Sequence, residues 1–321
     1  MAVPRRIGDW QAIMADHARV LDRLTGPAQM RQLKRVYDAA VSELERKLAV
    51  ALHTAIASPH DTMTALQYRV LLAQARVGVS TIARKLAGEA GAISRQATHE
   101  AVRVLAKTMN RLESRFAGAP VSLPLEQSAR FWGLVDARAT SAMRLHETSM
   151  ARYGTRLVGD MEEGLGLSLA TGESGIDAVD RIVEIADGAE YQAERIVRTE
   201  SAWAFSGATA DGIEEAVVDL PDLMMQWSEH VSPGGVPYDD RVSVDSLAMH
   251  GQVTSPGGLF TCPPMAPDGT PMPGEGKPWC LAGKQFEFPP NRSNDRSVLR
   301  PFRKHWGIPG WTWKDGQRIA I

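Results

Sequence analysis

The sequence of 321 residues is poor in several features that would place it in a class of proteins. It has only two cysteines, Cys262 and Cys280, which are too few for a scaffold built on disulfides. Its 36 basic and 38 acidic residues leave a net charge of -2, so no overall attraction to nucleic acid or to an anionic membrane follows. No run of ~18 apolar residues occurs, and Asp9, Gln11 and Asp16 interrupt the N-terminal segment where a signal peptide would have its apolar core. We therefore expect a protein made in the cytoplasm, with no membrane span.

Short catalytic motifs are also missing. The sequence contains no GxSxG, HExxH, GxxxxGK[ST] or GxGxxG. Asp239 and Asp240 are adjacent, so on an extended strand their carboxylates face opposite sides and do not form an acid/base pair. His250 stands alone beside a glycine, a setting more typical of a structural histidine than of a general base. These observations predict that the chain is not an enzyme.

The two cysteines do not have the spacing of a metal site. Zinc ligands usually come in pairs a few residues apart, whereas Cys262 and Cys280 are separated widely and no CxxC or HxxxH occurs. His230 and His250 complete a set of four ligands only if the fold brings all four together. We expect buried free thiols, no metal and no cofactor. A metal- or thiol-dependent enzyme centred on His250, Cys262 and Cys280 is the alternative.

The first half of the chain has the pattern of long helices. Apolar residues recur at steps of three and four from Gln29 to Ala55, which predicts an amphipathic helix. Asp61 or Thr62 is placed to cap a second helix, and the absence of proline from Met63 to Phe116 predicts that this helix is long. Gly78, Gly88 and Gly91 leave open whether it is continuous or broken. A loop at 118–126 precedes further helices over 127–169, 176–186 and from 190 onward.

The pattern changes after Leu220. Most of the prolines, five of the eight tryptophans and both cysteines lie in this last part of the chain. Short apolar runs bounded by glycine and proline predict strands at 223–228, 241–244, 252–254 and 286–288. The predicted fold class is α+β, with an elongated, mostly α-helical N-terminal half and a small, loop-rich α+β C-terminal domain.

Several motifs of the second half, taken in order, resemble a known family. The segment RIVRTESAWAFSGATADG (195–212) is similar to a helix with an RTE–A–N/S–G pattern in phage Mu F-like head morphogenesis proteins, the minor head proteins of tailed bacteriophages. In that family a tryptophan-bearing strand, D-x-R-V, histidine-glycine-glutamine, a glycine before phenylalanine and a proline-rich closing motif follow. The corresponding residues are Arg198, Glu200, Trp227, Asp240, Arg241, His250, Gly251, Gln252, Gly258, Phe260, Asn294, Asp295 and Arg296. At Arg292-Ser293 this chain departs from the histidine-proline usual in the family.

The resemblance implies both an organisation and a function. It divides the chain into a helical arm or bundle at 1–169, a Mu F-like head morphogenesis domain at 170–304 and a C-terminal tail rich in tryptophan and basic residues at 305–321. It implies a minor capsid protein of the virion, located in the head interior or at the portal and present in the host cytoplasm during assembly. The implied partners are the portal protein, the major capsid protein or both, and the long helices add self-association into a homo-oligomer as an expectation.

The motif residues have a physical interpretation that needs no catalysis. Charge-assisted hydrogen bonds from Arg198 and Glu200 would fix neighbouring segments, and Asp240 with Arg241 would join loops of a domain with a small apolar core. Gly251 would allow a tight backbone turn, and Asp295 with Arg296 would anchor the returning C-terminal segment. We predict that these residues form a polar framework.

The last thirty-one residues carry an excess of five positive charges. The cations are Arg292, Arg296, Arg300, Arg303, Lys304, Lys314 and Arg318. Trp306, Trp311 and Trp313 are interleaved with them. Basic residues with aromatic ones suit single-stranded or packaged DNA, but arginine and tryptophan are also enriched where proteins bind proteins. Docking on a partner protein is the favoured interpretation, with contact to packaged DNA as the alternative.

Overall fold

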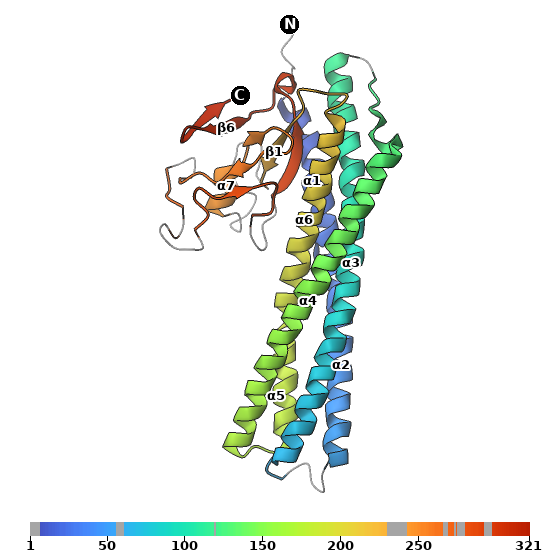
Figure 1. Ribbon diagram of the computed structural model, residues 1–321, viewed down its shortest axis with the longest axis vertical. Coiled ribbons are helices and arrows are strands. Elements are labelled where there is room, and N and C mark those ends of the chain that lie inside the picture. The colour runs from blue at the N-terminus through green and yellow to red at the C-terminus, as the bar shows by residue number, and fades with distance from the viewer. Residues whose placement is uncertain are drawn as a thin grey trace. The chain divides into compact units, whose positions relative to one another are not determined.

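The computed structural model of the protein describes residues 7–55, 61–118, 120–229, 243–265, 269–272, 274, 280–291 and 297–321. The helices described are α1 (Ile7–Thr25), α2 (Pro27–Ala55), α3 (Ala65–Ala117), α4 (Ala129–Thr171), α5 (Gly175–Gly188), α6 (Glu190–Ala216) and α7 (Val244–Met249). The strands described all follow residue 223, and they are β1 (Met224–Ser228), β2 (Val253–Thr254), β3 (Phe260–Thr261), β4 (Gln285–Phe286), β5 (Val298–Phe302), β6 (Trp311–Lys314) and β7 (Gln317–Ala320). The predicted fold class is confirmed: a mostly helical first half precedes a small α+β part (Figure 1).

The chain forms two compact units, and neither is continuous in sequence. The first unit comprises residues 1–26, 94–141 and 199–321, and the second comprises 27–93 and 142–198. Helices α3, α4 and α6 each contribute residues to both units. The division at 169/170 and 304/305 that the family resemblance implies is of another kind and stays a prediction.

The second unit is a bundle built from α2, α5 and the adjoining parts of α3, α4 and α6. Its core consists of the apolar faces of these helices, including Leu44, Leu48, Ile82, Leu86, Met150, Met161 and Ile182. Two buried tyrosines satisfy each other inside this core. The hydroxyls of Tyr37 and Tyr153 lie 2.9 Å apart, and that of Tyr37 also donates to the carbonyl of Ala186 at 2.5 Å. Both buried tyrosine hydroxyls therefore have a hydrogen-bond partner inside the core.

Helix α3 runs for 53 residues without a break, so its glycines do not end it. A Cβ at Gly78 would lie 2.4 Å from Cδ1 of Leu44, and one at Gly91 would lie 3.2 Å from Cγ of Met143. These two glycines let a neighbouring side chain approach the helix axis closely. Tertiary packing compensates for the helix propensity that glycine loses relative to alanine.

The helix starts depend on local caps. The side chain of Thr64 accepts a hydrogen bond from the backbone N–H of Gln67 at 3.3 Å, and the side chain of Gln67 accepts from the backbone N–H of Thr64. Thr64, rather than the predicted Asp61 or Thr62, therefore caps α3. At α5, which covers the helix expected over 176–186, Ser174 and Asp177 form a reciprocal capping box.

The first unit combines α1 and the remaining parts of α3, α4 and α6 with the strands. A three-stranded antiparallel sheet has the order β2-β1-β5, and α1 packs against β5. Strands β3 and β4 pair with each other, as do β6 and β7. Phe131, Phe205, Trp227, Phe302 and Trp306 are among the largest buried side chains of this core.

Two predicted segments of this part need correction. The strand expected at 241–244 is wrong at its described end, because Ser243 caps α7 by accepting from the N–H of Ser246, and Val244 is the first residue of that helix. The loop expected at 118–126 runs into a 3₁₀ turn, η1, at Pro124–Gln127. Apart from these two corrections, the structure describes residues 305–321, the tail implied by the resemblance, as the end of a second 3₁₀ turn, η2 (Lys304–Trp306), and the β6–β7 hairpin.

Candidate functional site

The motif positions that the structure describes in the C-terminal part gather around β1. Trp227 lies on this central strand, His250-Gly251-Gln252 follows α7 directly, and Phe260 begins β3. The rings of Trp227 and Phe260 are both fully buried and meet edge to face with centroids 5.4 Å apart. Trp227 and Phe260, which are far apart in the motif, are therefore in contact in the fold. Asp240, Arg241, Asn294, Asp295 and Arg296, together with His230, lie outside the described residues.

Gly251 joins β1 to the β6–β7 hairpin. Its N–H donates to the carbonyl of Trp227 at 2.8 Å, and its carbonyl accepts from the N–H of Trp311 at 3.0 Å. The backbone has φ +81° here, and a Cβ would lie 3.3 Å from the indole ring of Trp311. Both the conformation and the close approach favour glycine, as the sequence predicted.

The side-chain amide of Gln252 forms two hydrogen bonds with the backbone of Thr261, as a neighbouring strand would. Its Nε2 donates to the carbonyl of Thr261 at 3.0 Å, and its Oε1 accepts from the N–H of Thr261 at 2.8 Å. Its own carbonyl accepts from the N–H of Trp227 at 2.8 Å. One buried residue thus links β1 to β3, and both backbone groups of Thr261 depend on it.

Hydrogen bonds hold both the ring and the backbone carbonyl of His250. Its Nδ1 accepts from the N–H of Glu229 at 3.1 Å, so in the neutral ring Nε2 carries the proton. Its carbonyl accepts from Nε1 of Trp311 at 2.8 Å. Burial, together with smaller contributions from the positive charges of Arg300 and Arg318, lowers the pKa of His250 to about 4. The imidazole is therefore neutral near pH 7.

Both cysteines are buried and neither forms a disulfide. Burial raises the pKa of Cys262 to about 12, with smaller contributions from the charges of Asp245 and Cys280. Its Sγ contacts the carbonyl of Pro263 at 3.7 Å and Sδ of Met272 at 3.9 Å. A thiol in this state is protonated at neutral pH, whereas nucleophilic cysteines need a lowered pKa.

No group of three or more His, Cys, Asp or Glu side chains that could hold a metal ion occurs among the described residues. Across the same residues, no helix is long and apolar enough to cross a membrane.

The RTE segment lies on α6, and one of its contacts involves a residue that the sequence did not single out. The guanidinium of Arg138, on α4, pairs with both carboxylate oxygens of Asp211 at 3.0 and 2.7 Å. It also lies 5.5 Å from the ring centroid of Trp203 and 5.6 Å from that of Phe288. A Cβ at Gly207 would lie 3.2 Å from this guanidinium, which gives the motif glycine a packing role.

Arg198 and Glu200 lie on the same helix, about three turns or more before Asp211. Arg198 pairs with Glu194 of its own helix at 3.4 Å, while its Nε is buried without a hydrogen-bond partner among the described residues. Glu200 also has a partner, although one of its carboxylate oxygens is buried without a hydrogen bond in the described part of the chain.

Cations of the C-terminal segment make internal contacts. Arg303 pairs with Glu113 of α3 at 2.6 Å and with Asp222, and Nε1 of Trp306 donates to the same oxygen of Glu113 at 2.8 Å. Arg318 stacks 4.3 Å from the ring centroid of Trp311 and donates to the carbonyl of Ala248 at 2.5 Å. Arg303 and Arg318, which the sequence pattern assigns to binding a partner protein or DNA, therefore also form contacts within the first unit.

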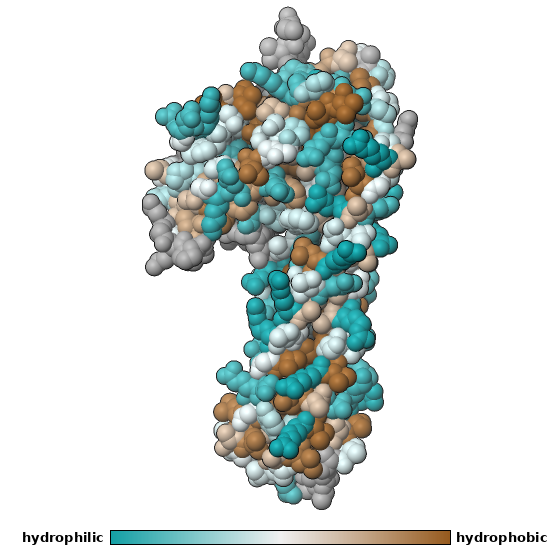
Figure 2. All heavy atoms as spheres, viewed as in Figure 1, coloured by the Kyte–Doolittle hydropathy of each residue, from teal (hydrophilic) through white to brown (hydrophobic). Residues whose placement is uncertain are grey.

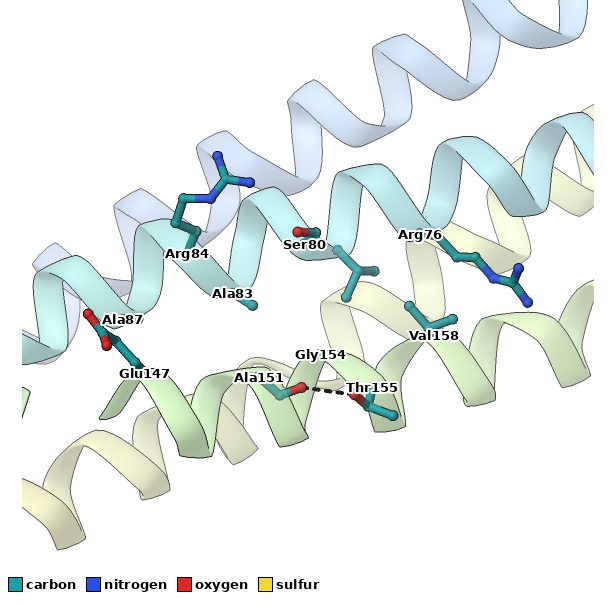
Figure 3. Close-up of a pocket in the computed structure, with 11 residues that line it drawn as sticks. Arg76, Ser80, Ala83, Arg84, Ala87, Glu147, Ala151, Gly154, Thr155 and Val158 are labelled. Carbon is teal, nitrogen blue, oxygen red and sulfur yellow. Dashed lines mark hydrogen bonds between the residues drawn. The ribbon is translucent and has the colours of Figure 1, made fainter. Parts of the chain in front are cut away.

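A groove of about 560 Å³ lies in the second unit, between α3 and α4 (Figure 3). Its residues are Arg76, Val79, Ser80, Ala83, Arg84 and Ala87 of α3 and Glu147, Ala151, Gly154, Thr155 and Val158 of α4. No sequence motif predicts this groove, because it arises where two long helices present small side chains to solvent.

No protein-family model, curated protein or solved structure matches the chain.

Proposed function

We propose that this protein is a minor head protein of a tailed bacteriophage. It acts in head morphogenesis, in procapsid assembly, through contacts with portal or major capsid subunits. The proposal rests on the ordered motifs, from the RTE segment of α6 to the proline-rich segment near the C-terminus, that resemble Mu F-like head morphogenesis proteins.

One observation from the structure supports a structural role for these motifs. His250, Gly251 and Gln252 form hydrogen bonds with backbone groups in or directly after β1, in β3 and in β6. Trp227 and Phe260 fill the core between these strands. These contacts support a role for the motif residues in holding the strands of the first unit together.

The test uses particles of the phage or prophage whose genome encodes the chain. Procapsids and mature heads are purified, and their proteins are quantified by mass spectrometry against the major capsid protein. We expect the chain in procapsids at a small fraction of the capsid protein's copy number, and cross-links from it to portal or capsid subunits. A nonsense mutation in its gene should reduce the yield of infectious particles.

A matched pair of variants separates folding from assembly. Gln252→Ala should lower both the stability of the first unit and the yield of particles, while Lys85→Glu, at an exposed position of α3, should leave both unchanged. Absence of the chain from procapsids, with a normal particle yield when its gene is disrupted, would refute the proposal.

A further inference from the structure

The groove between α3 and α4 has features of an incomplete helix bundle. Its α3 wall contains Arg76, Ser80, Ala83 and Ala87, which follow one another at steps of four, three and four. Its α4 wall contains Glu147, Ala151, Gly154 and Val158, with the same steps. This is the spacing of the a and d positions at which helices of a coiled coil or four-helix bundle meet. Both helices therefore direct a bundle-type seam toward solvent.

The two helices come close beneath this seam. A Cβ at Gly154 would lie 3.3 Å from Cβ of Ala83 and 3.5 Å from Cγ1 of Val79. Val79, Ala83 and Gly154 are buried, whereas Ser80, Ala151 and Thr155 on the outer side are exposed. The floor is closed and apolar, and the exposed side chains above it are short. Other helices can approach such a surface closely.

Charge is divided across the groove. Arg76 and Arg84 lie on the α3 side, and Glu147 lies on the α4 side (Figure 3). Glu162, one turn beyond the groove on α4, pairs with Arg76 at 3.2 Å. Arg84 and Glu147 have no ion-pair or hydrogen-bond partner within the parts of the chain that the structure describes. The α3 side of the groove, the positive rim, is thus left with Arg84 unpaired, and the α4 side, the negative rim, with Glu147 unpaired, among the described residues.

We propose that a second copy of this chain covers the groove, so that α3 and α4 of two copies form a four-helix bundle around a two-fold axis parallel to the helices. Under this axis α3 of each copy lies over α4 of the other. The positive rim then faces the negative rim twice, and neighbouring helices run antiparallel. A two-fold axis across the helices would instead place arginine over arginine, so the charges select the parallel axis.

The size of the surface agrees with this occupant. Residues 65–93 of α3 belong to the second unit together with residues 142–171 of α4. At 1.5 Å per residue and ~10 Å per helix, the two helices offer a face of ~43 by ~20 Å, or roughly 850 Å². A standard stable interface buries ~800 Å² on each partner. The groove alone is smaller than that, so the association needs the whole α3–α4 face.

The register also brings the unpaired charges near each other. Gly154 lies beside Ala83 and Glu162 beside Arg76, so Glu147 lies about six residues along the axis from the level of Arg84. Across the two-fold axis this offset is ~9 Å, which the two long side chains can span between them. We expect two Arg84–Glu147 pairs between copies, one on each side of the bundle.

The experiment measures the mass of the full chain in solution. Sedimentation equilibrium should give twice the 35.0 kDa mass of one chain at concentrations above a Kd in the micromolar range. Arg84→Glu and Glu147→Arg should each weaken association about tenfold or more, since each sets two pairs of like charges across the interface. An equimolar mixture of the two variants should dimerise as the parent chain does, because every pair in the mixed dimer is again of opposite charge.

Three controls keep the result specific. Lys85→Glu and Glu163→Arg make the same changes of charge at exposed positions that do not line the groove, and should leave the dimer intact. Thr155→Trp fills the groove from an exposed position and should give a folded monomer by circular dichroism. A parent chain that stays monomeric, single variants that dimerise normally, or a mixture that fails to recover would each overturn the proposal. None of these outcomes bears on the proposed role in phage heads, which rests on the first unit and on particle composition.

Discussion

Two buried histidines of the first unit should make its stability depend on pH between 7 and 5. His17, on α1, is fully buried beside the ring of Phe205, and neither of its ring nitrogens has a hydrogen-bond partner among the described residues. Burial lowers its pKa to about 3, with a further contribution from the charge of Arg300. His250, with a pKa of about 4, has Arg300 as a neighbour too. Both rings are therefore neutral in the folded protein across this range.

The sign and size of the effect follow from proton linkage. In the unfolded chain each histidine titrates near pH 6.5, so below that pH the unfolded state binds protons that the folded state does not. The free energy of unfolding is unaffected well above pH 6.5 and falls as the pH is lowered toward the folded pKa values. At pH 5 each histidine should cost about 2 kcal/mol relative to pH 7, or about 4 kcal/mol for the two together.

Urea unfolding at pH 7 and pH 5, at one ionic strength and followed by tryptophan fluorescence, measures this difference. His17→Met keeps a similar side-chain volume, removes the titrating group and two unpaired polar atoms, and should recover about half of the loss at pH 5. It should also raise stability at pH 7 by ~1–3 kcal/mol. Equal stability of the parent at the two pH values, or an undiminished loss in His17→Met, would refute the reasoning.

Two further predictions concern packing and hydrogen bonding. Gly212→Ala should lower the free energy of unfolding by ~1–3 kcal/mol, because its Cβ would lie 2.5 Å from Cδ2 of Leu105; Gly88→Ala, with no atom within 4 Å, should instead raise it by ~0.5–1 kcal/mol. Thermal unfolding checks both, and a gain at Gly212 would contradict the packing described. Gln252→Ala should cost ~1–3 kcal/mol by leaving the N–H and carbonyl of Thr261 unpaired, and hydrogen exchange should show the Thr261 amide losing protection.

The long helices α2 and α3 are the elements that the apolar periodicity of the sequence predicts best. The helix expected from Gln29 to Ala55 is α2, and the proline-free stretch from Met63 is α3. What periodicity left open was the effect of the glycines in α3. Gly78 is tolerated because Leu44 of another helix packs against it, and a contact between helices leaves no trace in a local pattern.

Short strands were harder to predict, for a physical reason. Strand β5 contains Pro301, which normally argues against a strand, but β5 is at the edge of its sheet, where proline is tolerated. Val244 has the β-branched side chain typical of strands, yet the cap at Ser243 starts a helix there. Partners distant in sequence decide such segments, and single-residue preferences do not reveal them.

The same distinction applies to the candidate site. Gly251 and its turn follow from residue type, since few other residues adopt its backbone conformation. The clasp between Arg138 and Asp211 joins residues 73 positions apart on two helices, and an arginine on a helix surface normally signals only solvation. Only the fold identifies Asp211 as the partner of Arg138.

The interleaving of the two compact units has a consequence for synthesis on the ribosome. The first unit takes its earliest helix from residues 7–25 and the strand that packs on that helix from residues 298–302, so almost the whole chain must emerge before that contact forms. The second unit is complete once residue 198 has left the exit tunnel. We infer that the second unit folds first while α1 still lacks its contact with β5, and that a fragment ending before β5 leaves the part of α1 that packs on this strand exposed to chaperones or to aggregation.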